Sequence, residues 1–215
     1  MSKEDAIRIV QIYAEGHAEA LSVEEEIRLG NDLFNNLKSI EDIVPMLVSG
    51  FETAEWRACY IVSESDEIAC HVFPYIIPLI RSKRPSIRNI ACECYRWCAN
   101  SGVHVAEVIK CLEDPERSVR LCAVIALSGI HVQLIQDAIV SLRIEGKVEL
   151  AHTVEIIVVG DLPFRELNFE TVKLESRLKK LCYYVLAVRA GVRDGELIQF
   201  VKTLDEPDLL FFHRR

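Results

Sequence analysis

The sequence has few glycine, proline and aromatic residues. Its 215 residues include 9 Gly and 7 Pro, and 7% of them are aromatic. This scarcity excludes a collagen-like or linker-rich chain, and a hydrophobic content of 50% excludes an intrinsically disordered one. A chain of this length can bury a substantial core, as one large domain or as two small ones. Its many Ala, Leu, Ile, Val and Glu residues favour helices joined by short turns.

No export or membrane segment is visible in the sequence. Residues 1–8 contain no apolar stretch after a basic start, so no signal peptide is expected. No uninterrupted apolar run reaches the roughly 18 residues that a membrane helix needs. Eight cysteines in a chain without an export signal are typical of reduced thiols in the cytosol. We therefore expect a soluble, cytoplasmic protein that does not bind membranes.

The motifs of several enzyme classes are also missing. The chain has no His-Glu-x-x-His, no Gly-x-Ser-x-Gly and no Gly-x-x-x-x-Gly-Lys, so zinc proteases, serine hydrolases and phosphate-binding loops lack support. The six histidines are scattered along the chain, although sequence alone leaves a Cys–His nucleophile open. We predict no catalytic residue and no cofactor, and hence a protein that is not an enzyme.

A group of cysteines is the best candidate for a metal site. Cys92, Cys94 and Cys98 lie close together, and Cys111 and Cys122 follow in the next part of the chain. Cys94 and Cys98 would share a helix face, and thiolates suit zinc. However, there is no Cys-x-x-Cys pair, and a buried cysteine behaves as a small hydrophobic residue. We therefore favour core packing over zinc binding and predict no metal site.

Similar segments recur about every 30 residues along the chain. The clearest are residues 56–62, 87–94 and 119–127, which open with an apolar residue and Arg and continue with small or apolar residues at helical spacing. The same register places further starts at 27, 148 and 178, so that the steps are 29, 31, 32, 29 and 30 residues. Such a period predicts helical hairpins, each of which buries its apolar face only by stacking on the next.

An acidic turn with a proline also repeats. Glu113-Asp114-Pro115-Glu116 returns 92 residues later as Asp205-Glu206-Pro207-Asp208, a distance of three repeats. Proline cannot continue the preceding helix but suits the first turn of the next one, where acidic residues are favourable. Each of these turns therefore predicts a boundary between two helices.

The stretch 113–120, with Ala123, Ala126 and Leu127, resembles the HEAT-like repeat, particularly the short form of the phycobilisome-lyase type. The resemblance is strongest at residues 104–127 and would extend over about residues 20–210. The resemblance implies an all-α fold, namely an α-α superhelix (a right-handed HEAT-like solenoid) of about six helical hairpins. It also implies that the protein binds macromolecules. We expect one domain, 1–215, with an N-terminal capping helix at 1–26, repeats at 27–208 and a C-terminal cap at 209–215.

Residues 154–161 allow two interpretations. The segment is rich in β-branched residues and ends in Gly-Asp, as a buried strand does. It also falls where the fifth repeat needs its second helix, and a lone strand would have no pairing partner. We predict a buried helix.

Charge is unevenly distributed along the chain. The net charge of the chain is −8. Residues 1–67 contain 15 Asp and Glu residues and 5 Lys and Arg residues, whereas the rest of the chain contains 18 Asp and Glu residues and 20 Lys and Arg residues. Solubility and helix N-termini explain part of this excess. We predict that the rest forms an acidic surface for a basic protein, with two aromatic residues as anchors unless Trp56 lies in the core. The predicted partner-binding residues are Glu52, Glu55, Trp56, Tyr60, Glu64, Asp66 and Glu67.

One basic stretch supports a different function. Residues 81–88 contain Arg81, Lys83, Arg84 and Arg88, and some HEAT-like proteins are DNA glycosylases that hold DNA against a basic face. Trp56, Trp97 and Tyr95 would be available for such a pocket, but the other repeats lack the matching Lys and Arg residues. We favour an inter-repeat turn with solvated side chains.

These features predict a non-enzymatic α-solenoid that binds one protein partner. A small, acidic, stand-alone repeat array resembles in type a bacterial immunity protein of a toxin–antitoxin pair, and a basic nuclease-type toxin domain would suit the charge. Nucleic acid is disfavoured as the partner, because the net charge opposes phosphate binding. The alternatives are the DNA glycosylase and a lyase-like or assembly chaperone that binds a client protein.

Overall fold

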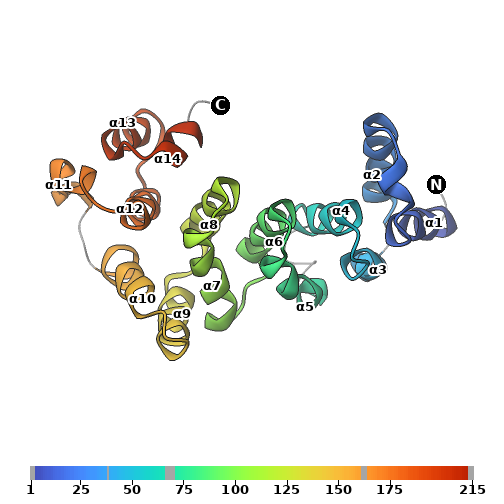
Figure 1. Ribbon diagram of the computed structural model, residues 1–215, viewed down its shortest axis with the longest axis horizontal. Coiled ribbons are helices and arrows are strands. Elements are labelled where there is room, and N and C mark those ends of the chain that lie inside the picture. The colour runs from blue at the N-terminus through green and yellow to red at the C-terminus, as the bar shows by residue number, and fades with distance from the viewer. Residues whose placement is uncertain (1–2, 38, 66–70, 161–163, 213–215) are drawn as a thin grey trace. The chain divides into compact units, whose positions relative to one another are not determined.

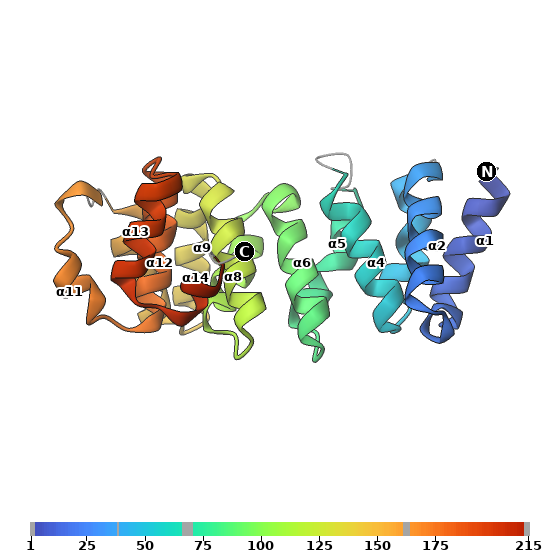
Figure 2. The same ribbon diagram turned by 90° about the horizontal axis from the view of Figure 1, so that it is seen from above.

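The computed structural model describes residues 3–37, 39–65, 71–160 and 164–212, and these residues contain helices and no strand (Figures 1 and 2). The predicted all-α fold class is confirmed. The chain divides into two compact units, residues 1–98 and 99–215. The single domain and the superhelical course of the whole chain stay predictions. Within the described ranges, no helix is both long and apolar enough to span a membrane.

Unit 1, residues 1–98, alternates long helices with short ones. α1 packs on α2 and α3, and α4 packs on α6, α3 and the short helix η1 (Figure 1). Tyr13, Ile61 and Tyr95 are fully buried between them. The elements are α1 (Lys3–Ala14), η1 (His17–Ala20), α2 (Val23–Asn36), η2 (Ile40–Ile43), α3 (Val44–Leu47), α4 (Glu52–Ser63), α5 (Phe73–Ile76), η4 (Ile77–Arg81) and α6 (Pro85–Cys98).

Unit 2, residues 99–215, contains the remaining helices. α7 packs on α9, α9 on α10, and α11 on α13. Val119, Leu127 and Leu142 are fully buried. The elements are α7 (Gly102–Lys110), η5 (Cys111–Glu113), α8 (Arg117–Gly129), α9 (Val132–Ile144), α10 (Val148–Val154), η6 (Glu155–Val159), η7 (Phe164–Glu166), α11 (Phe169–Lys173), α12 (Arg177–Arg189), α13 (Asp194–Leu204) and α14 (Pro207–Phe212).

The predicted repeat spacing matches the helices. The starts at 27, 56, 87, 119, 148 and 178 fall within α2, α4, α6, α8, α10 and α12, and other helices lie between them. Residues 1–26 are not one helix, because Gly16 ends the first helical segment with a left-handed backbone (φ +79). Ser22 and Glu25 then form a capping box that begins α2. The predicted C-terminal cap falls on α14, where Leu209 is fully buried; residues 213–215 lie outside the described ranges.

Both acidic turns lie at helix boundaries, as predicted. Pro207 is the first residue of α14, where its missing N–H costs no hydrogen bond. Pro115 lies two residues before α8, and Glu116 occupies the N-cap position of that helix. Both turns therefore mark helix boundaries, but the expected proline and acidic residue in the first turn occur only in α14, since Pro115 lies before α8 and the first turn of α8 contains no acidic residue.

The segment 154–159 is helical rather than extended. α10 ends at Val154 and is followed by a π-helix, η6, from Glu155 to Val159. Ile157 and Val158 are buried. The Gly160 N–H donates to the carbonyl oxygen of Glu155 at 2.8 Å, which closes the wider turn. The predicted helix is confirmed for residues 154–159, of which Ile156 is 49% exposed; Gly160 follows as an extended C-cap, and residue 161 lies outside the described ranges.

Unit 2 departs from a simple stack of neighbours. α8 packs on α12 and α14, which belong to later repeats, so the expectation that each hairpin contacts only the next is wrong here (Figure 2). The fifth repeat supplies a seven-residue α10 and one π-helix, and these do not separate α8 from α12. Arg189 at the end of α12 donates to the carbonyl oxygens of Leu127 (3.2 Å) and Ile130 (2.7 Å) at the end of α8. The two helices are thereby joined at their C-terminal ends.

Candidate functional site

α4 carries four of the predicted partner-binding residues. Glu52, Trp56, Tyr60 and Glu64 follow one another at four-residue intervals, so they lie along one side of the helix and its C-cap. Glu52 and Glu64 are exposed, while the two aromatic side chains are half-buried. Glu52 opens the helix, where its charge complements the helix dipole. The structure therefore gathers an acidic and aromatic stripe from residues that the sequence had suggested.

The two aromatic rings of this stripe are stacked. The ring centroids of Trp56 and Tyr60 lie 5.5 Å apart, and the planes differ by 4°. The guanidinium carbon of Arg57 lies 5.5 Å from the Trp56 centroid and 5.7 Å from that of Tyr60. Contacts of this kind limit the rotation of both rings. The half-exposed aromatic surface is thus held in a fixed position before any partner binds.

Arg57 is itself anchored by α2. Its Nε and Nη2 donate to Oε1 of Glu26 at 3.0 and 2.7 Å, and Nη2 also lies 2.7 Å from Oε2. The Tyr13 hydroxyl donates to the same Oε1 at 2.9 Å, and burial together with Glu26 raises the pKa of Tyr13. A Cβ atom at Gly30 would lie 2.5 Å from the Arg57 guanidinium, so a glycine makes room for it. This network fixes α4 against α1 and α2.

Glu55 does not belong to the acidic surface, contrary to the prediction. Its side chain is 6% exposed and lies 2.5 Å from Nη2 of Arg84. Burial raises the pKa of Glu55, and the Arg84 charge beside it works in the opposite direction. The correction has a simple cause: residue 55 lies one position before Trp56 on the helix, on the side that packs inward. Asp66 and Glu67 lie outside the described residues.

The N-terminal end of α4 borders an open hollow of about 380 Å³. Glu19 of η1 faces the helix there, and its Oε1 accepts a hydrogen bond from the Thr53 N–H at 3.0 Å. Glu52 accepts a hydrogen bond from the Ser86 hydroxyl. Among the described residues neither carboxylate has a cationic partner, in contrast to Glu26. The hollow is lined by Ala18, Glu19, Leu21, Val23, Glu26, Glu52, Thr53 and Trp56.

Sequence reasoning did not find Glu19 as part of this site. The residue lies 34 positions before Thr53, in a short 3₁₀ helix that no repeat pattern marks. The left-handed turn at Gly16 redirects the chain after α1, and a ring carbon of Phe51 would lie 2.5 Å from a Cβ at this glycine. That close approach brings η1 against the start of α4. The only signal in the sequence was the general acidity of residues 1–67.

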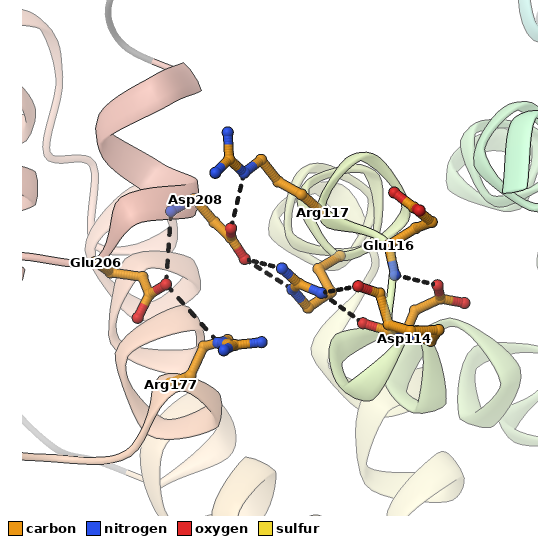
Figure 3. Close-up of polar contacts among 8 residues, drawn as sticks. Asp114, Glu116, Arg117, Arg177, Glu206 and Asp208 are labelled. Atoms are coloured by element: carbon orange, nitrogen blue, oxygen red, sulfur yellow. Dashed lines mark hydrogen bonds and ion pairs between the residues drawn. The ribbon is translucent and has the colours of Figure 1, made fainter.

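A second hollow, of about 630 Å³, lies in unit 2. Figure 3 shows charged side chains that line it, among them Arg117, Arg177 and Asp208. Asp208 pairs there with Arg117 and Arg120, with Nε of Arg117 at 3.0 Å and Nη2 of Arg120 at 2.6 Å from its carboxylate. Glu206 lies 4.0 Å from Nε of Arg177. The three arginines are balanced by Glu116, Glu206 and Asp208, which line the same hollow. These pairs join helices and leave no excess charge to attract a ligand.

The arginines of the basic stretch also have structural partners. Besides Glu55, Arg84 binds the carbonyl oxygen of Gly50 at 3.0 Å. Arg88 donates to the carbonyl oxygens of Ser82 (3.0 Å) and Lys83 (3.3 Å). These contacts support the interpretation as an inter-repeat turn. The glycosylase alternative loses one further candidate, because Tyr95 is fully buried.

The cysteines that the structure describes lie in the core, as predicted. The Cys94 thiol donates to the carbonyl oxygen of Cys59 at 3.2 Å, and burial, with Cys59 beside it, raises the pKa of Cys94. Within the described residues, no group of three or more His, Cys, Asp or Glu side chains is placed to hold a metal ion. The buried cysteines are Cys59, Cys92, Cys94, Cys98, Cys111, Cys122 and Cys182.

Comparisons of the chain with protein-family models, with curated proteins and with solved structures gave no match. Function is therefore inferred from the chain's own residues, chiefly those around α4.

Proposed function

We propose that this chain is a non-enzymatic, HEAT-like α-solenoid that binds one basic protein partner. The most specific form of the proposal is a bacterial immunity protein that neutralises a basic, nuclease-type toxin by covering it in the cytoplasm. The observation that carries it is the acidic stripe on α4, where Glu52 and Glu64 are exposed on either side of the fixed Trp56–Tyr60 pair.

Charge and aromatic surface would serve different stages of binding. The net charge of −10 on residues 1–67 attracts a basic protein and accelerates its association. Trp and Tyr side chains dominate the binding energy of many interfaces, and rings already held in place lose little entropy on binding. The stacked pair on α4 therefore supplies the contact that retains the partner once charge has brought it close.

The test is affinity capture from the host with matched charge variants. The double variant Glu52→Lys/Glu64→Lys changes the charge by the same amount as Glu170→Lys/Glu196→Lys, whose exposed carboxylates lie in unit 2. We expect the wild type and the unit 2 variant to retain one stoichiometric basic protein after a wash at high salt. The α4 variant should capture at least about tenfold less, mainly through slower association.

Equal capture by both variants would contradict the role of α4. Recovery of nucleic acid alone would contradict protein binding and favour the glycosylase alternative. The immunity role needs one further measurement, in which the captured protein is expressed with and without this chain. Toxicity that is suppressed by the wild type and restored with the α4 variant is the expected result; a harmless partner would overturn the immunity assignment.

A further inference from the structure

We infer that the hollow between η1, α2 and α4 accepts one cationic side chain, a lysine or an arginine, of the partner. This inference rests on the proposed function, since it names the part of a basic partner that unit 1 recognises. It adds Glu19 and the lining of the hollow to a site that the sequence had placed within residues 52–67.

The lining suits the two parts of such a side chain. Leu21, Val23 and Trp56 offer apolar surface for the aliphatic stem. Glu19 and Glu52 offer carboxylate oxygens for the charged head. Long basic side chains place their stems on apolar surface and their heads on polar groups. The volume of about 380 Å³ is at the lower end of the range for ligand pockets, about 300–1,000 Å³, and is sufficient for one long side chain.

The electrostatics of the hollow select a cation. Arg57 neutralises Glu26, which leaves the charges of Glu19 and Glu52 without a cationic partner among the described residues. A helix N-terminus such as that of α4 would otherwise attract an anion. Here the Thr53 N–H already donates to Glu19, and two carboxylates repel negative charge. The hollow therefore carries an excess of about two negative charges that a partner's cation would balance.

Apolar surface continues from the hollow along α2. Val23, which lines the hollow, is 70% exposed, and Ile27, one turn further on, is 48% exposed. Residues four apart lie on one face of a helix, so the two side chains form a short apolar strip. This strip would contact the residues that flank the inserted cation. Charge selects the inserted side chain, and apolar contact surrounds it.

The inference is tested by NMR titration of the full chain with three capped tripeptides, in which alanines flank arginine, lysine or neutral citrulline. The indole N–H of Trp56 reports on the hollow, and that of Trp97, which lies outside it and is 42% exposed, serves as an internal reference. We expect the arginine and lysine peptides to shift the Trp56 signal saturably, while citrulline does not. Comparison of the two cationic peptides shows which head group is preferred.

Conservative variants locate the binding charge. Glu19→Gln and Glu52→Gln keep an oxygen that accepts the hydrogen bonds of Thr53 and Ser86, so folding is expected to persist and is checked by circular dichroism. Each should weaken binding of the cationic peptides about threefold, as expected for a charge pair near the surface. Glu170→Gln, an exposed carboxylate in unit 2, serves as the matched control and should leave binding unchanged.

Equal shifts with citrulline, no shift of Trp56, or equal weakening by Glu170→Gln would overturn the inference. Its failure can be told apart from failure of the proposed function. If capture of the basic protein depends on Glu52 and Glu64 while the peptides leave Trp56 unaffected, the proposed function stands and the cation pocket does not. If the peptides bind as expected but no protein is captured, the pocket stands and the proposed function fails.

Discussion

Arg120 and Asp208 form a buried ion pair, with Nη2 and Oδ2 2.6 Å apart, although 88 residues separate them in the chain (Figure 3). Arg120 Nη1 also donates to the carbonyl oxygens of Asp114 (2.6 Å) and Pro115 (2.8 Å). One guanidinium thus joins the two acidic-proline turns, 113–116 and 205–208, that repeat in the sequence. The pair fixes α14 and the start of α8 to each other.

Loss of this pair should destabilise unit 2. Asp208→Ala leaves Arg120 buried without its carboxylate, which costs about 3 kcal/mol of unfolding free energy for a buried pair. Arg177→Ala is the control, because Arg177 is 59% exposed and 4.0 Å from its partner, and should cost less than about 1 kcal/mol. Urea unfolding followed by circular dichroism measures both. Similar losses for the two variants would show that Arg120 gains nothing from Asp208.

Gly30→Ala should destabilise unit 1, although alanine favours helices. A Cβ atom there would lie 2.5 Å from the Arg57 guanidinium and displace it from Glu26. The helix propensity gain of about 1 kcal/mol is outweighed by overpacking of about 1–3 kcal/mol and the loss of the ion pair. We expect a lower melting temperature and altered fluorescence of Trp56.

Gly195→Ala provides the control for this substitution. Nothing lies within 4 Å of a Cβ atom at Gly195, which is also in a helix. Without a steric conflict, alanine should leave stability unchanged or raise it by up to about 1 kcal/mol. A stabilising effect of Gly30→Ala as well would mean that Arg57 moves aside without loss, and that its contact with Glu26 is weak.

Mild acid should weaken unit 2 through His104. Burial lowers the pKa of His104 below its usual 6.5, and the first turn of α7 also disfavours a positive charge. The neutral form of His104 is therefore favoured in the folded state. At a pH above the pKa that His104 has in the unfolded chain, its contribution to folding stability is fully present. Stability is lost as the pH falls from about 6.5 through the lower folded pKa. Thermal melts between pH 7.5 and 5 should show a smaller decrease for His104→Gln; an identical decrease would assign the effect to other groups.

The Cys182 thiol should react slowly while the protein is folded. Burial raises its pKa to about 12, and the thiolate is the reactive form. Iodoacetamide at pH 8 should therefore modify Cys182 at least about a hundredfold more slowly in buffer than in urea, as measured by peptide mass spectrometry under reducing conditions. Rapid modification in buffer would show that α12 opens frequently.

Local patterns allowed much of the helical structure to be predicted. The apolar spacing around Val119 and the acidic-proline turns marked helices and their boundaries, because these features act over one or two turns of chain. The same reasoning assigned residues 154–161 to a buried helix and Cys94 to the core. It named Trp56 and Tyr60 as anchors beside the acidic residues, and their stacking follows from their four-residue spacing on α4.

The sequence by itself determined the helices, their spacing of about 30 residues and the acidity of the first third of the chain. Only the tertiary structure decided which charges remain available. Arg84 neutralises Glu55 from 29 residues away, whereas Glu19 lies beside Thr53, 34 residues further on, and has no cationic partner within the described part of the chain. Arg120 finds Asp208 three repeats later. Contacts at such separations depend on how whole helices pack, and helical periodicity carries no information about which distant side chains will meet.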